Sequence, residues 1–479
     1  MNLAVQIDRG ASASLQDQLF EQLRQLILSG ALKPNTRIIA TRFLAEQAGV
    51  SRTTALLAYE RLISEGYLET RPAVGTFVCA EPPGQARSIT IPPDAVGGFE
   101  RPTRLAAALQ AVSPGCLFDL SSGRVDGAHL LPKKVWLEGV HRVLERDPEG
   151  MRRPVSPVGA RALCRAIADY LVANRGIIAA PEQVLVVAGK RQAINLVAHI
   201  LLPRDHRVIV ESPGDPTIVD ALKAHNAEIF AAPVDEDGLV TDSLPEGPAA
   251  LALVSPARQN PIGGVLSGER RDAMLDWARR AGAHLVEDDC DSAFSYRGSA
   301  PLPLAARDRD GRVFYYGSFD KTLGAGIGLG YLIVPRQFIA SLAAIKSTGE
   351  EGGAWLEQMV VADLINSGAY DRHLRRIRKI YLDRRDALVG ALRQHFGEAR
   401  FIGFERGTQL TWLAPDLLPD AAEIHRMAKD AGIRLDELKF DSRTPALALR
   451  DRALVMGYAA SPPDKLRQAV AHLAKALKQ

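Results

Sequence analysis

Cysteine is scarce in this chain of 479 residues, and the four that occur are Cys79, Cys116, Cys164 and Cys290. None has a second cysteine at the close spacing of a zinc site or a redox-active pair, so the sequence predicts neither kind of site. This scarcity is typical of a reducing compartment, and we expect the chain to be cytoplasmic.

Long apolar runs and an excess of one charge are also missing. We find no run long enough to span a bilayer, and the first residues lack the charged-then-apolar layout of a signal peptide, so we expect no membrane partner. Lys and Arg number 59 against 56 Asp and Glu, which leaves a net charge of +3. A nearly neutral total neither requires nor excludes a nucleic-acid partner, because a small basic surface can lie within it.

Residues 1–80 contain three helical patterns followed by two short strands. Leu15, Leu19, Leu23 and Leu26 share one face of a helix that Ser14 can cap. Residues 41–48 and 51–65 form the second and third helical patterns, and residues 67–70 and 76–78 alternate as strands do. This order predicts a winged helix-turn-helix, whose third helix enters the major groove of DNA.

The start of the third helix gathers groups that suit a DNA contact. Ser51, Arg52 and Thr53 place hydroxyls and a guanidinium at a helix N-terminus, where they can meet phosphates and base edges. Arg42 on the second helix can reach the phosphate backbone, and Gly75 allows the turn of the wing to approach the minor groove. A helical protein-interaction module is the alternative, but the order of all the elements favours double-stranded operator DNA.

Several segments of residues 1–80 resemble the DNA-binding domain of GntR-type bacterial regulators. They include Leu-Ala-Glu-Gln-Ala-Gly-Val-Ser-Arg-Thr-Thr at 44–54, Ala-Tyr-Glu-Arg-Leu at 58–62 and Gly-Thr-Phe-Val at 75–78. The resemblance implies that Arg42, Ser51, Arg52, Thr53 and Gly75 contact DNA. Residues 38–41 read Ile-Ile-Ala-Thr where the family usually has Leu-Pro-Ser-Ser, so the second helix is expected to start differently.

Residues 81–118 are rich in Pro, Gly and Ala and show little periodicity. We predict a linker here, and a partly ordered strap over the next domain remains an alternative. Residues 119–479 then alternate between short apolar runs and helical stretches. The apolar runs, at 184–187, 207–210, 251–254, 284–286 and 313–316, predict an α/β domain whose mostly parallel sheet is covered on both faces.

Polar loops follow these predicted strands, where parallel sheets bind their ligands. Gly189 stands at a helix start and can offer free amides to a phosphate. Asn260 precedes a proline, and Asp288 follows the fourth strand. Lys321 follows the fifth strand, three residues after Ser318, and its amine can condense with an aldehyde.

This order resembles that of the fold-type I aminotransferases, which bind pyridoxal 5'-phosphate. The resemblance implies that Lys321 bonds to the cofactor aldehyde and that Asp288 pairs with its pyridine nitrogen. Asn260 would bond the ring hydroxyl, and Ser318 and the amides near Gly189 would hold the phosphate. Asp289 and Asp291 are expected to cap a helix or face solvent. The family's carboxylate-binding arginine corresponds to Arg450 or Arg452, and the sequence does not choose between them.

The sequence departs from the fold-type I pattern around the expected cofactor. The departures are Gly328 for a phosphate-binding arginine, Cys290 for a tyrosine, Asp215 for an aromatic residue, Asp320 for a serine, Arg258 for a histidine, and Pro154 near the place of a partner subunit's tyrosine. We therefore expect a remodelled pocket without transaminase turnover. Because Lys190 and Arg191 follow Gly189, our hypothesis is that one of them supplies the missing positive charge.

A GntR-like head joined to an aminotransferase-like body resembles the MocR subfamily of transcriptional regulators. The resemblance implies a regulator that senses pyridoxal 5'-phosphate or a related small-molecule effector, and a homodimer that presents two heads to paired DNA half-sites. Two alternatives stay open. One is a working aminotransferase with an accessory DNA-binding domain, and the other is a regulator that has lost the cofactor and senses another ligand.

Overall fold

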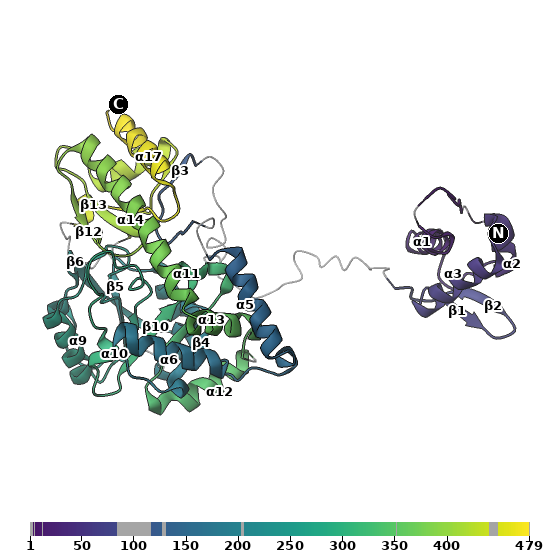
Figure 1. The fold of residues 1–479 in the computed structure, drawn as a ribbon, viewed down its shortest axis with the longest axis horizontal. Helices are drawn as coiled ribbons and strands as arrows, with labels where there is room; N and C mark the ends of the chain where they lie inside the picture. Colours follow the sequence, from purple (N-terminus) through teal and green to yellow (C-terminus); the bar gives the residue numbers. More distant parts are fainter. Residues whose placement is uncertain are drawn as a thin grey trace. The chain divides into compact units, whose positions relative to one another are not determined.

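The computed structural model describes residues 3, 5–11, 13–83, 116–126, 131–202, 206–350, 352–439 and 449–478. The chain forms two compact units, residues 1–110 and residues 111–479 (Figure 1). The linker predicted over residues 81–118 lies outside the described residues from 84 to 115. The predicted boundaries at 80 and 118 therefore stay predictions.

The first unit contains three helices and a two-stranded sheet in the predicted order. The elements are α1 (Leu15–Leu28), α2 (Thr41–Ala48), α3 (Arg52–Ser64), β1 (Leu68–Arg71) and β2 (Gly75–Val78). The two strands pair antiparallel, with Leu68 opposite Val78 and Arg71 opposite Gly75. Helix α2 begins without a side-chain cap, because Ala40 stands at the N-cap position. The fold is the predicted winged helix-turn-helix.

The core of this unit lies where the three helices meet. Leu19, Leu23 and Ile27 of α1 are fully buried, and they pack in one cluster with Leu44 of α2 and Leu62 of α3. Leu26, which the sequence placed on the buried face of α1, is only partly buried. The helical period of 3.6 residues moves the buried stripe from Leu23 to Ile27 rather than to Leu26.

The second unit is built on an eight-stranded sheet. Its strands lie in the order β4, β11, β10, β9, β8, β5, β6, β7. Their bounds are β4 (Val184–Val187), β5 (Arg207–Ser212), β6 (Glu228–Asp235), β7 (Gly238–Leu239), β8 (Leu251–Val254), β9 (His284–Asp288), β10 (Val313–Ser318) and β11 (Gly330–Ile333). The run from β10 through β9, β8 and β5 to β6 is parallel, and β11 is antiparallel to both β10 and β4. The sheet is thus mostly parallel, as predicted.

Helices cover both faces of this sheet. Alternate residues of β4 point to opposite sides: Val184 and Val186 join one apolar cluster, and Leu185 and Val187 join another. The first cluster includes residues of α6 (Arg161–Arg175) and α13 (Trp355–Asn366), and the second includes residues of α7 (Lys190–Leu201) and α12 (Ile339–Gly349). Burial on both faces explains why the predicted strands read as continuous apolar runs.

Further helices complete the large part of the second unit (Figure 1). They are α5 (Lys133–Arg146), α8 (Pro216–Ala224), α9 (Gly268–Ala281), α10 (Leu304–Arg307) and α11 (Asp320–Leu323). Helix α9 packs on the sheet through Met274, Trp277 and Ala278, which share a buried cluster with Ile209 and Ala252. Within the described ranges, no helix is long and apolar enough to cross a membrane.

The C-terminal part of the second unit has small sheets of its own. Strands β12 (Arg400–Ile402), β13 (Gln409–Leu413) and β15 (Ala453–Gly457) pair antiparallel, and β14 (Ile433–Arg434) pairs with β3 (Phe118–Asp119). The other helices here are α15 (Ala421–Asp430), α16 (Leu449–Arg452) and α17 (Pro463–Ala476).

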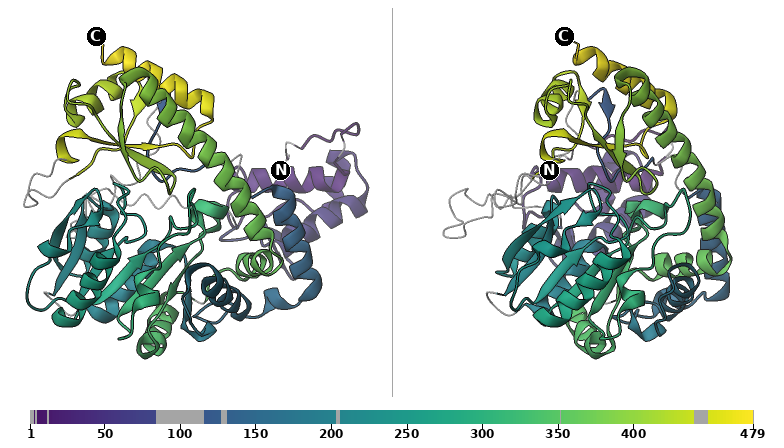
Figure 2. Two further views of the ribbon diagram at one scale, coloured as in Figure 1. Left: turned by 60° about the vertical axis from the view of Figure 1, so that its left-hand side comes forward. Right: turned by 90° about the vertical axis from the view of Figure 1, so that its left-hand side faces the viewer.

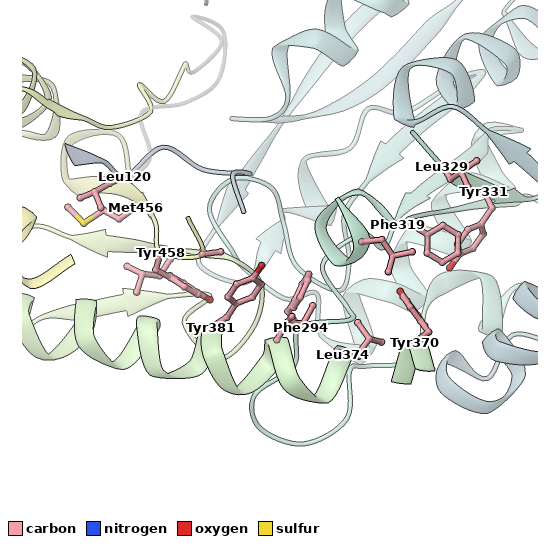
Figure 3. Packing of buried hydrophobic residues seen from close by; sticks show 14 of the residues in the cluster. Leu120, Phe294, Phe319, Leu329, Tyr331, Tyr370, Leu374, Tyr381, Met456 and Tyr458 are labelled. Carbon is pink, nitrogen blue, oxygen red and sulfur yellow. The ribbon is translucent and has the colours of Figure 1, made fainter. Parts of the chain in front are cut away.

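One long helix, α14 (Ala369–Phe396), joins this part to the large sheet and is drawn in green in Figure 2. Tyr370 and Leu374 lie toward one end of the helix, beside Phe319, and Tyr381 lies toward Tyr458 (Figure 3). All these residues belong to one buried cluster. The two parts of the second unit therefore share a hydrophobic core.

A buried ion pair fixes the end of α6 to the end of β9. Arg175 donates from Nε to Asp289 Oδ2 over 2.7 Å, and the Tyr315 hydroxyl donates to the same oxygen over 2.5 Å. Asp289 is only 4% exposed. Our expectation that Asp289 caps a helix or faces solvent is therefore wrong. A buried guanidinium needs a carboxylate partner, and Asp289 supplies it.

Replacing Asp289 with alanine should destabilise the second unit by about 3–5 kcal/mol, because it leaves the Arg175 charge buried and unpaired. All four tryptophans, Trp136, Trp277, Trp355 and Trp412, lie in this unit, so urea unfolding followed by tryptophan fluorescence reports on it alone. The control is Asp272→Ala, which removes an exposed partner of Arg307 and should cost less than about 1 kcal/mol. If both variants lowered the free energy of unfolding by the same amount, the buried pair between Arg175 and Asp289 would not have the structural role assigned to it.

Candidate functional site

A cavity of about 250 Å³ opens at the carboxyl ends of the parallel strands. It gathers residues from the ends of β9 and β10, from the loop after β8 and from the first turn of α7. The charged and polar residues that line it include Lys190, Arg258, Asn260, Asp288, Cys290, Asp291, Ser318, Asp320 and Lys321. Five residues predicted from four separate segments, Lys190, Asn260, Asp288, Ser318 and Lys321, thus come together in one place.

The sheet explains why these residues meet. Tyr316 on β10 lies opposite Asp288 on β9 in a parallel register, so the two strands end side by side. On the other side of β11, β4 ends just before Gly189, which is the N-cap of α7 and has a φ of 133°. This backbone conformation favours glycine and turns the chain so that Lys190 begins the helix.

The carboxylate of Asp288 is bound to a lysine of the chain itself. Lys190 Nζ lies 2.6 Å from Asp288 Oδ2 and 3.8 Å from Asp215 Oδ2, and the backbone N–H of Cys290 donates to Asp288 Oδ1 over 3.1 Å. Burial alone would lower the pKa of Lys190, but Asp288 outweighs it and raises that pKa above its usual value. For Asp288, burial is likewise outweighed, and Lys190 and the Cys290 N–H hold its pKa below the usual range.

The amine of Lys321 is also paired. Its Nζ donates to Asp291 Oδ1 over 2.6 Å, and Arg258 donates from Nη1 to Asp291 Oδ2 over 3.1 Å. Arg258 is held in turn by backbone carbonyls, that of Gln409 at 2.7 Å from Nη2 and that of Arg406 at 3.1 Å from Nε. Burial would raise the pKa of Asp291, but Lys321 and Arg258 outweigh it and lower that pKa to about 2.

Asp291 was expected to cap a helix or face solvent, and that expectation is wrong. Its side chain is only 7% exposed and stands between two cations. The sequence analysis did not identify Asp291 as the partner of Lys321, or Arg258 as the second partner of Asp291. A signal was present, because charged residues in loops that follow buried strands tend to be buried together and must then pair.

The expected phosphate end of the cavity carries a carboxylate. Ser318 Oγ accepts the backbone N–H of Asp320 over 3.0 Å, and Asp320 Oδ1 is buried with no hydrogen-bond partner among the described residues. Burial raises the pKa of Asp320, and Ser318, Lys190 and Lys321 only partly offset this. Gly328, where the arginine would stand, has a φ of +61°, and a Cβ added there would meet open space.

Other residues singled out in the sequence lie away from the cavity walls. Arg191 is exposed, Pro154 is exposed, and neither lines the cavity. Arg450 and Arg452 do not line it either, and Arg452 donates to the backbone carbonyls of Pro415, Leu418 and Pro419. Asp215 is the exception, because its Oδ2 lies 3.8 Å from Lys190 Nζ beside the cavity, and it also caps α8 by accepting the Thr217 N–H over 3.0 Å.

The residues of the cavity fit the aldehyde and the ring hydroxyl of pyridoxal 5'-phosphate. They do not fit its ring nitrogen or its phosphate. Lys321 and Asn260 stand in the cavity, where an aldehyde and a ring hydroxyl would need them. Asp288, however, already binds an ammonium group, and the phosphate end offers the Asp320 carboxylate instead of an arginine. A dianion beside an unpaired carboxylate is disfavoured by like-charge repulsion and by the loss of hydration.

The expected DNA-contacting residues lie on the surface of the first unit. Arg52 and Thr53 are exposed at the start of α3, and Ser51 caps this helix by accepting the Thr54 N–H over 3.0 Å. Arg42 is exposed on α2, with its guanidinium 4.5 Å from the centre of the Phe43 ring. Gly75 has a φ of +136°, and a Cβ there would lie 2.8 Å from Arg37 Nε.

The ion pair at Asp291 should make stability depend on pH in a defined window. Because its folded pKa lies below the usual value, its stabilisation of about 2–3 kcal/mol is present above pH 4 and is lost as the pH falls toward 2. The free energy of unfolding of Asp291→Asn should therefore approach that of the wild type as urea unfolding is repeated at falling pH. A difference that stays constant from neutral pH to pH 3 would contradict the pairing.

Two family models match the chain. The model of bacterial regulatory proteins of the gntR family matches residues 15–78, and that of aminotransferase class I and II matches residues 117–414. Among curated relatives, the "Probable rhizopine catabolism regulatory protein MocR" of Rhizobium meliloti is 31% identical, over 98% of this chain and 95% of its own. The "HTH-type pyridoxine biosynthesis transcriptional regulator PdxR" of Corynebacterium glutamicum is 33% identical over 82% of each chain.

Solved structures share the fold of the second unit. An archaeal alanine:glyoxylate aminotransferase superposes with a TM-score of 0.68 at 23% identity, over 78% of this chain and 94% of its own. The α-aminoadipate aminotransferase LysN of Thermus thermophilus, complexed with N-(5'-phosphopyridoxyl)-L-leucine, gives 0.66 at 24% identity, over 78% and 96%. At this identity the likeness shows the fold alone.

The relatives and both family models agree with the two units of the structure. The chain is therefore an HTH-type transcriptional regulator of the gntR family and belongs to its MocR subfamily, in which a winged helix-turn-helix is joined to an aminotransferase-like domain.

Proposed function

We propose that the second unit is an effector sensor, that the cavity at Lys321 is its ligand site, and that ligand binding there controls how the first unit holds operator DNA. One observation carries this proposal. Charged residues from four separate loops converge in the cavity, as in a ligand site, yet they are arranged in ion pairs with one another. Such a site can bind and respond to a ligand without turnover chemistry.

Amino-acid transamination is not part of the proposed function. The amine of Lys321, which transamination would need as its nucleophile, is held by the Asp291 carboxylate at 2.6 Å. Neither Arg450 nor Arg452 lines the cavity to hold a substrate carboxylate. Purified protein supplied with amino acids, 2-oxo acids and pyridoxal 5'-phosphate should therefore form no new amino acid above the rate without protein. Multiple turnovers that disappear in Lys321→Ala would overturn this part of the proposal.

The proposed assembly is a homodimer that presents two heads to two half-sites. The support is the family resemblance, since fold-type I bodies are usually dimers, and the symmetry that paired DNA half-sites require. Within each head, the exposed N-terminal turn of α3 would enter the major groove, with Arg52 and Thr53 reaching the DNA.

Arg52→Ala should weaken specific operator binding by about 1–3 kcal/mol, the range for loss of a bidentate contact with a base. Footprinting and a fluorescence-anisotropy titration of full-length protein with operator DNA measure this effect. The matched control is Arg24→Ala, which removes an arginine of α1 that is paired with Glu21. It should bind the operator as the wild type does. An unchanged footprint for Arg52→Ala would disprove the assignment of α3 as the recognition helix.

A further inference from the structure

Each cation that lines the cavity at Lys321 is already bound to a carboxylate of the chain. Within the described part of the chain, its cationic lining residues are Lys190, Arg258 and Lys321. Lys190 is paired with Asp288, and Lys321 and Arg258 share Asp291. A phosphate dianion that took Lys190 away would leave Asp288 without its cation, which is costly in a partly buried site, and one that took Lys321 or Arg258 would break a buried pair with Asp291.

The position of Lys190 is the main observation. Its side chain is 25% exposed and its Nζ lies 2.6 Å from Asp288 Oδ2. The family resemblance implies that Asp288 pairs with the pyridinium nitrogen of the cofactor. In this chain the Lys190 ammonium group pairs with the Asp288 carboxylate instead. Lys190 also begins α7, the helix whose N-terminal amides were expected to receive the phosphate.

Asp320 is the second, independent observation. It lies directly before Lys321 and lines the same cavity, and its Oδ1 is buried without a hydrogen-bond partner among the described residues. Because its side chain lines the cavity and forms no ion pair with another described residue, the Asp320 carboxylate favours a hydroxyl or an ammonium group of a ligand and disfavours a phosphate oxygen.

We propose that Lys190 has replaced the cofactor's pyridinium at Asp288 and that Asp320 excludes a phosphate, so the cavity takes an unphosphorylated small molecule with a hydroxyl or ammonium group directed at Asp320. The inference rests on the proposed function for the role of the cavity as the sensor's ligand site. It reverses the expectation that Lys190 or Arg191 holds a cofactor phosphate, and the two ideas predict opposite effects of the same substitution.

The test is equilibrium dialysis of the full-length protein against pyridoxal 5'-phosphate and, separately, against pyridoxal, which carries a hydroxyl in place of the phosphate ester. The wild type should bind the phosphorylated form no more tightly than pyridoxal. The double variant Lys190→Ser, Asp320→Ser frees Asp288 and removes the repelling carboxylate. Its affinity for pyridoxal 5'-phosphate should rise at least about tenfold, and its affinity for pyridoxal should change less.

Two further variants keep the test decisive. Arg191→Ser removes a positive charge one residue along the same helix but outside the cavity, so it should change neither affinity. Asp320→Ser alone leaves the pair between Lys190 and Asp288 in place and should still gain affinity for the phosphorylated form, which guards against poor folding of the double variant.

The inference is overturned if the wild type binds pyridoxal 5'-phosphate about tenfold more tightly than pyridoxal. That factor corresponds to one hydrogen bond between the phosphate and a charged side chain. It is also overturned if neither the double variant nor Asp320→Ser gains affinity for pyridoxal 5'-phosphate, including the case in which no protein binds it. The single variant Lys190→Ser is measured as well, and a loss of its affinity for pyridoxal 5'-phosphate would overturn the inference in favour of a phosphate-binding role for this lysine. These titrations contain no DNA, so a failure of the full-length chain to bind operator would contradict the proposed function separately.

Discussion

The ion pair between Lys190 and Asp288 is the interaction on which the rest of the site depends. Asp288 ends a buried strand, and an unpaired carboxylate is costly in a partly buried cavity, so a positively charged group must pair with it. In this chain the partner comes from the start of α7 rather than from a ligand. Lys321 then pairs with Asp291, and Arg258 completes that group. Apart from Asp320, the charged side chains named here are therefore paired with one another.

The same pairs connect the cavity to the C-terminal part of the second unit. Arg258 binds Asp291 with one nitrogen and the backbone carbonyls of Arg406 and Gln409 with the others. Asp291 and Lys321 follow strands β9 and β10 of the large sheet, whereas Gln409 begins β13. A ligand that competes for Asp291 would thus act on a guanidinium that also holds the C-terminal part, which gives ligand binding a physical means to alter the unit's structure.

Much of the fold could be predicted from the sequence, because the winged helix-turn-helix and the parallel strands have strong local patterns. The strands of the large sheet are buried on both faces and read as apolar runs. Strand β11 was missed, since its sequence, Gly-Tyr-Leu-Ile, follows a glycine-rich loop that gave no strand signal. Lys190, Asn260, Asp288, Ser318 and Lys321 were placed together correctly, because parallel strands end at one edge. The partner of Asp289 could not be predicted, since Arg175 ends helix α6 and only the folded chain brings it near, whereas Arg258 and Asp291 follow neighbouring strands and their pairing was missed.

A double-mutant cycle on Lys190 and Asp288 tests the central claim most directly. The variants are Lys190→Met, Asp288→Asn and the two combined, and the measured quantity is the free energy of urea unfolding of the second unit in the absence of any added ligand. If the two side chains satisfy each other, their effects are not additive, and the coupling is about 0.5–3 kcal/mol in favour of the pair. Additive effects would show that Lys190 does not hold Asp288, and the account of a self-paired sensor cavity would be wrong.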